Sequence, residues 1–283
     1  MIRIAIQSKG RLNEESLALL RDAGVKIDDL KRKFLGRSAN YPLEVLYLRD
    51  DDIPEVVADG SADIGIVGLN EVAEKGVDVD IVRRLSFGGC RLSLAVPKDA
   101  GYEDLSWFNG KIIATSYPGV LKKFLAEKGI DASVRVIMGS VEIAPAAGIA
   151  DAIFDIVSSG GTLVSNGLTE VERVLESEAV LIANPNLSDE KKEILNSLLF
   201  RTDAVIDSRG KKYILMNIPS DKVEEVLQVL PALRSPTVMP LAATGWCSLH
   251  SVVKENELWD KVEKLKALGA EGILVLQLDK VIE

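Results

Sequence analysis

The segment of this 283-residue sequence with the clearest chemical potential runs from Asp151 to Leu168. It opens with acidic side chains around a short apolar run of the buried-strand type. Small residues follow, and we expect a helix to begin near Thr162. Where a strand gives way to a helix, successive backbone N–H groups point outward and the helix dipole favours negative charge. The pattern therefore predicts a binding site for an anion such as a phosphate group.

Side chains of the same loop suit that purpose. Ser158, Ser159 and Thr162 each supply a hydroxyl donor. Gly160 and Gly161 allow the backbone to approach a phosphate because no side chain intervenes. The loop is not a Walker loop, since no lysine follows the glycines, and it lacks a GxGxxG fingerprint.

Two carboxylates, Asp151 and Asp155, lie just upstream of the loop. Carboxylates in comparable positions accept hydrogen bonds from ribose hydroxyls in dinucleotide sites. An acid followed by a phosphate-binding loop is the combination that a ribose 5-phosphate requires. The alternative is a Ser- and Gly-rich turn between a strand and a helix, with solvated acids nearby.

Cationic side chains follow two other predicted strands. Lys9 and Arg11 come after the run 2–6, and Arg49 comes after the run 44–48. In these positions they could neutralise a triphosphate or pyrophosphate, and an arginine can do so through a bidentate contact. Structural alternatives stay open: Lys9 and Arg11 as solvated charges before a helix, and Arg49 in a surface ion pair with the acids at 50–52.

Four further residues are candidates for lining a second substrate. Asn70 and Glu71 follow a buried-type strand, Tyr117 follows another, and Glu142 follows a Gly-Ser-Val turn. Each has a structural alternative, which is a polar helix start for Asn70, Glu71 and Glu142 and simple packing for Tyr117. The single histidine, His250, lies in a predicted strand near the C-terminus, and we expect no catalytic role for it.

The first two-thirds of the sequence alternate between strand and helix patterns. Helix ends are recognisable, as in the helix expected to start at an Asn13 N-cap and to end at Gly24. The alternation predicts an α/β architecture with mostly parallel sheets. So many strands predict two lobes, and we expect the chain to enter the second lobe near residues 88–90 and to return near 175–185.

The last third has a different rhythm. Strand patterns at 211–218, 237–241, 247–253 and 273–278 alternate with two helical stripes. The resulting order, β-α-β-β-α-β, is the ferredoxin-like pattern and predicts a separate α+β domain. The expected domains are therefore a first lobe at 1–90 and 180–208, a second lobe at 91–179, and a C-terminal domain at 209–283.

Bulk composition restricts the classes of partner and compartment. The formal net charge of -9 disfavours nucleic acid or an anionic membrane as the main partner, because both reward a basic surface. No apolar run reaches the ~18 residues of a membrane helix. The N-terminus lacks the signal-peptide pattern, and the two cysteines, Cys90 and Cys247, have no metal-ligand spacing. We therefore expect a cytoplasmic protein with reduced cysteines.

The segment from Asp151 to Leu168 resembles the phosphoribosyl-pyrophosphate loop of ATP phosphoribosyltransferases, which typically reads D-A-I-x-D-x-V-x-S/T-G-x-T-L-x-x-N-x-L. Further blocks that resemble this family follow in the right order along the whole chain: Lys9-Gly10-Arg11-Leu12, Arg49 with Asp52-Ile53-Pro54 and Gly60, 63–68, 87–92, 114–118, 139–142 and 235–241. One departure is Gly119, where the family often has asparagine, so any contact from that side chain is in doubt.

The resemblance implies transfer of the 5-phosphoribosyl group of phosphoribosyl pyrophosphate to N1 of ATP, which releases pyrophosphate and opens histidine biosynthesis. It implies a two-lobed, periplasmic-binding-protein-like catalytic part and Mg²⁺ as cofactor. The implied catalytic residues are Asp151, Asp155, Lys9 and Arg11. The implied phosphoribosyl-pyrophosphate site consists of Asp155, Ser158, Ser159, Gly160, Gly161, Thr162 and Leu163. The implied ATP site consists of Arg11, Leu12, Arg49, Asn70, Glu71, Tyr117 and Glu142.

Long-form members of the family carry a C-terminal ACT-like domain that binds histidine as a feedback inhibitor. The block at 235–241 resembles the family's S-P-T-V-x-P-L signature, which implies effector contacts at Ser235, Thr237, Met239 and Leu241. The family also suggests homodimers that assemble into hexamers. Two alternatives remain at this point: a phosphoribosyltransferase with another acceptor, and a small-molecule-binding module of the same two-lobed fold.

Overall fold

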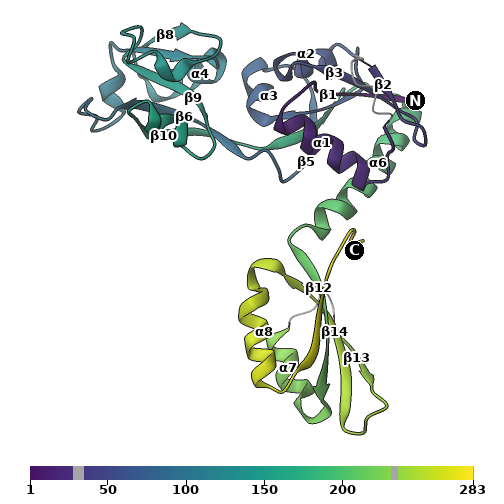
Figure 1. Ribbon diagram of the computed structural model, residues 1–283. Coiled ribbons are helices and arrows are strands. Elements are labelled where there is room, and N and C mark those ends of the chain that lie inside the picture. Colours follow the sequence, from purple (N-terminus) through teal and green to yellow (C-terminus); the bar gives the residue numbers. More distant parts are fainter. Residues whose placement is uncertain (28–34, 231–234, 283) are drawn as a thin grey trace. The chain divides into compact units, whose positions relative to one another are not determined.

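The computed structural model describes residues 1–27, 35–230 and 235–282 (Figure 1). The chain divides into two compact units, Met1–Ser197 and Leu198–Glu283. The first unit contains two mixed sheets with helices, and the second contains one antiparallel sheet with two helices on its core side. The predicted α/β class, with two lobes and a C-terminal α+β domain, is therefore confirmed.

The first sheet has six strands in the order β2-β3-β1-β4-β11-β5. Its central strands β3, β1 and β4 run parallel to one another. They are apolar and buried, as expected for parallel strands that helices cover. The elements of this lobe are β1 (Ile2–Gln7), α1 (Arg11–Asp22), β2 (Leu35–Arg37), β3 (Leu43–Leu48), α2 (Ile53–Ala58), β4 (Ile64–Gly68), α3 (Leu69–Lys75), β5 (Asp80–Arg84) and β11 (Ala179–Ala183).

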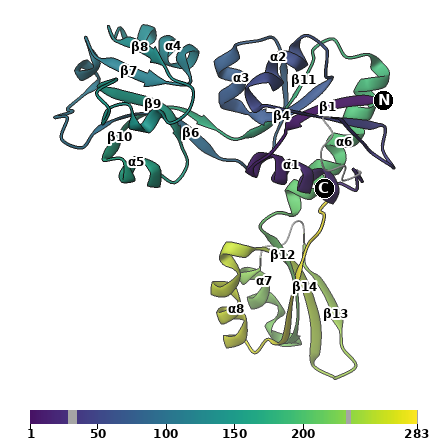
Figure 2. The ribbon, with the colours of Figure 1, turned by 45° about the horizontal axis from the view of Figure 1, so that its top comes forward.

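The second sheet has five strands in the order β10-β6-β9-β7-β8, and here β8, β7 and β9 form the parallel group. One face packs against α4, and the other packs against α5 and the short turn η3 (Figure 2). The elements of this lobe are β6 (Cys90–Pro97), β7 (Ile112–Thr115), α4 (Pro118–Lys128), β8 (Ser133–Val136), η3 (Val141–Ile143), β9 (Ala152–Val157), α5 (Gly161–Ser165) and β10 (Leu168–Ser177).

The expectation of mostly parallel sheets is wrong, because both sheets are mixed. The chain crosses between them twice, from β5 into β6 and from β10 into β11, and all four crossing strands pair antiparallel with their neighbours. A parallel neighbour needs a long crossover connection, usually a helix. Here β5 and β6 carry the chain out of the first lobe and β10 and β11 carry it back, so β6 pairs with β10 and β5 pairs with β11 in the antiparallel sense.

The first helix begins at Arg11 rather than at an Asn13 N-cap. Gly10 occupies the N-cap position with φ +92°, a conformation that side chains rarely adopt. The Asn13 amide instead donates to the Gln7 carbonyl oxygen at 2.6 Å. This bond ties the first turn of α1 to the end of β1, so residues 8–10 make a short connection directly after the strand.

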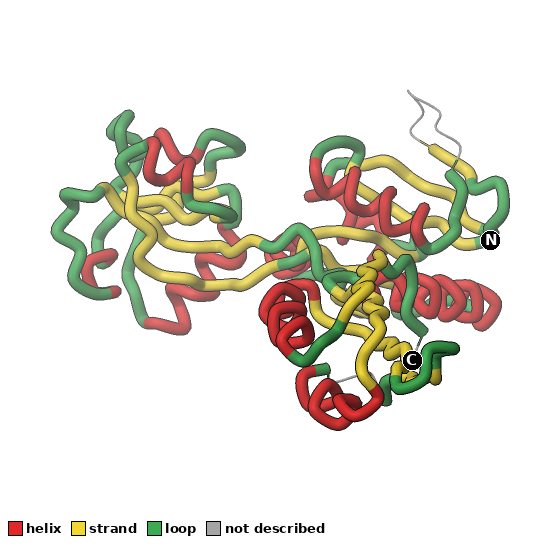
Figure 3. Tube along the Cα trace, turned by 60° about the horizontal axis from the view of Figure 1, so that its bottom comes forward, coloured by secondary structure: helices red, strands yellow, loops and turns green. Residues whose placement is uncertain are grey.

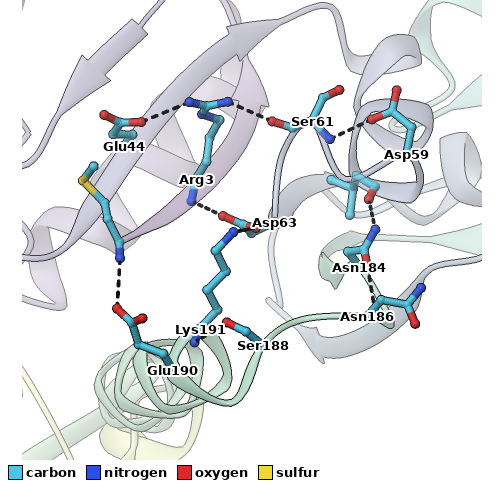
Figure 4. A network of polar contacts seen from close by, with 12 residues as sticks. Arg3, Glu44, Asp59, Ser61, Asp63, Asn184, Asn186, Ser188, Glu190 and Lys191 are labelled. Atoms are coloured by element: carbon cyan, nitrogen blue, oxygen red, sulfur yellow. Dashed lines mark hydrogen bonds and ion pairs between the residues drawn. The ribbon is translucent and has the colours of Figure 1, made fainter.

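A buried carboxylate holds the returning chain in the first lobe (Figure 4). Asp63, just before β4, accepts hydrogen bonds from the Arg3 backbone N–H and the Lys191 ammonium, both at 2.7 Å. Asn184, directly after β11, donates to the Val57 carbonyl oxygen at 2.8 Å. The segment between β11 and the start of helix α6 (Asp189–Ser208) is therefore fixed to β1, β4 and α2.

The second unit contains a four-stranded antiparallel sheet in the order β13-β14-β12-β15. Its apolar core lies between this sheet and helices α7 and α8 (Figure 3). The element order matches the predicted β-α-β-β-α-β pattern. The elements are β12 (Lys211–Pro219), α7 (Val223–Val229), β13 (Thr237–Pro240), β14 (Trp246–Lys254), α8 (Leu258–Ala267) and β15 (Glu271–Gln277).

A substitution at Phe108 tests how much the apolar core stabilises the second lobe. Its side chain is fully buried and packs in the cluster between α4 and the sheet. We expect Phe108→Ala to lower the free energy of unfolding by about 3–5 kcal/mol, since it removes buried apolar contacts and leaves a cavity. Met138→Ala, at a side chain that is 69% exposed, should change it by less than about 0.5 kcal/mol. Urea titration measures both, and equal shifts in the two variants would contradict this assignment of the core.

Candidate functional site

In the first lobe, the predicted polar residues follow three adjacent parallel strands. Lys9 and Arg11 come after β1, Arg49 comes after β3, and Asn70 and Glu71 come after β4. Because β3, β1 and β4 are parallel neighbours, these residues lie at one edge of the sheet. Ligands of open α/β sheets bind at this carboxyl edge.

The second lobe repeats this arrangement on β8, β7 and β9. Glu142 comes after β8, Tyr117 comes after β7, and the loop 158–160 comes after β9. Most of the predicted residues of the two lobes thus lie at the carboxyl edges of two parallel strand groups.

Asp151 is the exception, because it lies at the amino end of β9. Its carboxylate accepts the Ile112 backbone N–H at 2.8 Å, and its own N–H donates to the Ile112 carbonyl oxygen at 2.8 Å. The six residues of β9 separate it from the loop, which is about 20 Å of extended chain. Asp151 therefore starts the pairing of β9 with β7, and the structure does not bring it to the loop where the sequence placed it.

Asp155 lies in the second half of β9, two residues before its carboxyl end. It faces the side covered by η3 and α5, because its neighbours Ile153 and Val157 pack there. Burial is the main reason that the pKa of its carboxyl is raised, and the negative charge of Glu142 adds to the effect. A hydrogen bond from the Ser116 side chain acts in the opposite direction on this pKa. Asp155, Glu142 and Ser116 thus gather near the start of the loop.

The loop itself has the geometry of a strand-to-helix junction. Gly160 is the N-cap residue of α5, with φ +81°, and a Cβ there would meet nothing within 4 Å. Ser158, Ser159 and Thr162 are exposed. The first-turn N–H groups of a helix have no acceptor within the helix, so they are available to an anion. Leu163 is buried beneath and anchors the short helix in the apolar cluster.

An ion pair that the sequence did not reveal fixes the base of this loop. Arg91 on β6 binds Glu170 on β10 through two 2.5 Å contacts and donates to the Ser158 carbonyl oxygen at 2.9 Å. These contacts with Arg91, and a hydrogen bond from Ser93, lower the pKa of Glu170 to about 2. Arg91 was visible only as part of a family block, and its partner lies 79 residues away along the chain, so no local spacing could indicate the pair.

Asn70, Glu71 and Tyr117 form one buried hydrogen-bonded cluster, although they come from different lobes. The Tyr117 hydroxyl donates to Glu71 Oε1 at 2.7 Å, and the Asn70 amide donates to the same oxygen at 2.9 Å. Ser177 donates to Asn70 Oδ1 at 2.8 Å. Asn70 and Glu71 thus start helix α3, and the Tyr117 ring is buried, as the structural alternatives from the sequence stated. The three side chains also form one contact between α3 and the turn before α4.

The environment of this cluster changes the titration of its members. Burial raises the pKa of Glu71 to about 7, and the negative charges of Asp50, Asp51 and Glu74 add to the rise. Burial also raises the pKa of the Tyr117 hydroxyl, and the Glu71 carboxyl beside it acts in the same direction. At neutral pH, Tyr117 is therefore a hydrogen-bond donor that remains protonated.

The cations of the first lobe are exposed. Lys9 is exposed, Arg11 pairs with Glu15 at 3.0 Å, and Arg49 pairs with Asp51 at 3.0 Å. The Arg49 contact is the surface ion pair that the sequence offered as an alternative. Exposed pairs of this kind are weak, typically about 0–1 kcal/mol, so either arginine can exchange its partner for a bound phosphate at little cost.

The turn before Glu142 is strained in a way that the sequence does not show. Ser140 has φ +52°, one of two non-glycine residues with positive φ in the described chain. Such conformations are uncommon outside glycine and concentrate at functional sites. The turn leads into η3, where Val141 is buried and the neighbouring Glu142 is left partly exposed beside Asp155.

In the C-terminal unit, the residues of the 235–241 block lie on or beside the edge strand β13. Ser235, Thr237 and Met239 are exposed, and Leu241 is partly buried. Thr237 pairs with His250 across the sheet. His250 itself lies between the Tyr213 hydroxyl, at 2.8 Å, and the Ser248 hydroxyl, at 3.0 Å.

Comparison with known proteins shows the family to which this chain belongs. The family model described as ATP phosphoribosyltransferase matches residues 49–204, and the model described as HisG, C-terminal domain, matches residues 208–280. An ATP phosphoribosyltransferase of Bacteroides fragilis is 61% identical over 282 residues, and one of Bacteroides thetaiotaomicron is 60% identical, each over the full length of both chains. This chain belongs to the ATP phosphoribosyltransferase family. It is a long-form member, a transferase of histidine biosynthesis with a regulatory C-terminal domain.

Solved structures agree with this assignment. The ATP phosphoribosyl transferase (HisG:HisZ) complex from Thermotoga maritima contains a chain that is 30% identical, with a TM-score of 0.65, over 73% of this chain and 99% of that one. The substrate binding protein of an amino acid ABC transporter aligns with a TM-score of 0.50 at 14% identity, over 73% of this chain and 93% of that one. The second likeness shows the two-lobed fold alone.

Among the described residues, no helix combines the length and apolar character that a membrane crossing requires. The described ranges also contain no group of three or more His, Cys, Asp or Glu side chains placed to hold a metal ion.

The raised pKa of Glu71 predicts a specific pH dependence of stability. Between the ordinary value of 4.5 and about 7, the folded chain keeps a proton that the unfolded chain has lost, so this carboxyl stabilises the fold less as pH rises. We therefore expect the difference in unfolding free energy, Glu71→Gln minus parent, to rise with pH across that window. The rise should be at most about 1.4 kcal/mol per pH unit and should level off above pH 7.

Urea titration at several pH values measures this difference. Glu127→Gln, at an exposed position on α4, is the matched control and should give a flat difference. A flat difference for Glu71→Gln as well would mean that its carboxyl titrates at an ordinary pKa and is not buried in the folded protein.

Proposed function

We propose that phosphoribosyl pyrophosphate binds at the carboxyl end of β9. The 5-phosphate would lie against the backbone N–H groups and hydroxyls of the loop that follows the strand, and the ribose hydroxyls would bond to Asp155. Support comes from the junction geometry, the open space around Gly160 and the motif that this segment shares with the family. The residues of this proposed site are Asp155, Ser158, Ser159, Gly160, Gly161, Thr162 and Leu163.

ATP would occupy the other carboxyl edge and the turns that face it. Arg11 and Lys9 are exposed cations beside β1 and suit a triphosphate or the pyrophosphate that leaves. Glu142 and the turn at Tyr117 come from the second lobe and would line the adenine side. The residues of this proposed site are Lys9, Arg11, Leu12, Arg49, Asn70, Glu71, Tyr117 and Glu142.

The proposed reaction breaks the bond between ribose C1 and the pyrophosphate oxygen and forms a bond between C1 and adenine N1. Positive charge develops on the ribose ring while negative charge develops on the departing pyrophosphate. Asp155 would stabilise the first through its contact with the ribose, and the exposed cations after β1 would stabilise the second. Adenine N1 carries its own lone pair, so the reaction needs no dedicated base, and holding the two reactants in line supplies much of the acceleration.

The residues present fit Mg²⁺ held mainly by the substrate. Mg²⁺ usually takes one or two protein carboxylates together with waters and phosphate oxygens, and it does not need a cage of protein ligands. Asp155 and Glu142 are two such carboxylates, and burial together with the negative charge of Glu142 raises the pKa of Asp155. A bound cation would supply charge neutralisation on the pyrophosphate. It would also lower the pKa of Asp155 back toward its ordinary range.

The two places where the chain crosses between the sheets support a division of the catalytic part into two lobes. We propose a first lobe at 1–90 and 180–208, a second lobe at 91–179 and a regulatory domain at 209–283. In the regulatory domain, histidine would bind at Ser235, Thr237, Met239 and Leu241 on the exposed edge strand β13. Homodimers that assemble into hexamers are part of the same proposal, and so is a cytoplasmic location, where ATP and phosphoribosyl pyrophosphate are supplied.

The two aspartates of the motif separate this proposal from its alternatives. We expect Asp155→Asn to lower kcat/KM by about 100-fold or more, because the ribose loses a charged partner in the transition state. Asp151→Asn should keep at least half of the parent activity, since an asparagine oxygen can still accept the Ile112 N–H. The assay follows pyrophosphate release from ATP, phosphoribosyl pyrophosphate and Mg²⁺.

Other outcomes have a defined meaning. Equal losses of kcat/KM in the two variants would contradict the proposal that Asp155, and not Asp151, contacts the ribose. Binding of phosphoribosyl pyrophosphate without pyrophosphate release would support the binding-module alternative, and release only with a different acceptor would support the other one. Activity that histidine does not reduce would contradict the proposed effector site.

A further inference from the structure

The N-terminus of helix α4 lies at the lobe boundary and is capped by a residue that is distant in the sequence. The first N–H groups of a helix lack acceptors within the helix, and Pro118 at its first position has no N–H to satisfy. The next two donors, Gly119 N–H and Val120 N–H, point to the two carboxylate oxygens of Glu74, at 2.8 and 2.9 Å. One carboxylate on α3 thus caps a helix that belongs to the other lobe.

The contact depends on the absence of a side chain at position 119. A Cβ on Gly119 would lie 2.8 Å from the Glu74 carbonyl oxygen and 3.1 Å from each of its carboxylate oxygens. The carbonyl oxygen belongs to the backbone of α3, so it cannot move aside as a flexible side chain could. The backbone conformation of Gly119 is one that any residue can adopt. Glycine is therefore required because the two helices approach closely, and not because of a special φ angle.

Gly119 is also a position at which this chain departs from the family pattern. Asparagine, which often stands at this position in the family, would place a Cβ between α3 and α4. In this chain, the small residue and the acid form a matched pair.

The turn that leads into the capped helix carries a residue of the proposed substrate site. Tyr117 and Ser116 form the turn that leads into α4, and the Tyr117 hydroxyl donates to Glu71 Oε1 at 2.7 Å. Glu71 and Glu74 lie one turn apart on α3, so the two acids hold this turn at two points. We propose that Glu74 is a positioning residue: by capping α4 across the lobes, it fixes Tyr117 on the ATP side of the cleft.

This inference rests on the proposed function for its kinetic readout but not for its structural one. The structural test is hydrogen exchange of the peptide that contains Gly119 and Val120. In Glu74→Gln the side chain keeps its size, but its amide group turns an N–H toward one of the two donors. We expect exchange at these amides to accelerate about five- to tenfold, the usual effect of losing a helix cap.

The kinetic test separates positioning from general damage. Glu74→Gln should raise the KM for ATP about fivefold and leave the KM for phosphoribosyl pyrophosphate within about twofold, because the loop at 158–163 is anchored separately through Arg91. Gly119→Ala should act in the same direction, although alanine normally favours a helix over glycine. The controls are Glu127→Gln on the exposed side of α4 and Gly89→Ala, where a Cβ would meet nothing within 4 Å.

The outcomes are distinguishable. Parent-like exchange in Glu74→Gln would show that the cap does not exist in solution and would overturn the proposal. Faster exchange with an unchanged KM for ATP, or with equal rises in both KM values, would reduce the cap to a structural contact and also overturn it. If the parent releases no pyrophosphate at all, the proposed function fails, whereas the exchange result still decides whether Glu74 caps α4.

Discussion

The hydrogen bond from Tyr117 to Glu71 is the interaction on which the arrangement of the catalytic part depends. It joins the turn before α4 in one lobe to α3 in the other, and both groups are nearly excluded from water. A carboxyl group buried in this way is costly unless it is hydrogen-bonded, and Glu71 receives two donors at one oxygen. Its raised pKa is the consequence of that burial. The contact brings the carboxyl edges of two parallel strand groups to the same seam, which is where an α/β fold can hold two substrates together.

Contacts within the second lobe fix the loop after β9. Arg91 holds Glu170 and the Ser158 carbonyl oxygen together, so the loop after β9 begins from a fixed point. A bidentate pair of this kind has a defined geometry that a lysine could not reproduce. The apolar contacts of Leu163 then fix the first turn of α5. Exposed hydroxyls and N–H groups are thereby carried on a rigid base, and this suits a phosphate that must be held in one orientation.

Much of this was accessible from the sequence. Periodicity predicted the alternation of strands and helices in the two lobes, although not the strands β2, β5, β10 and β11, and it predicted the complete element order of the C-terminal unit. The family blocks located the loop at 158–163. The sequence failed where the deciding contacts are distant. Asp151 and Asp155 look alike in the motif, but Asp151 precedes β9 whereas Asp155 lies within it, and only the pairing of β9 with β7 shows that Asp151 bonds to Ile112. The sequence predicted mostly parallel sheets because local patterns carry no direction of pairing, whereas the crossing strands pair antiparallel. The role of Glu74 as a cap could not be predicted because its partners lie 45 and 46 residues away along the chain.

The central claim is that the two substrates occupy the two carboxyl edges, with phosphoribosyl pyrophosphate at the end of β9. Hydrogen exchange of the parent protein, with each substrate added separately, tests it most directly. The account predicts that phosphoribosyl pyrophosphate slows exchange in the segment 158–165, and that ATP slows exchange after β1 and in the turn at 116–120. Protection by phosphoribosyl pyrophosphate at the amino end of β9, around Asp151, with none at 158–165, would contradict it.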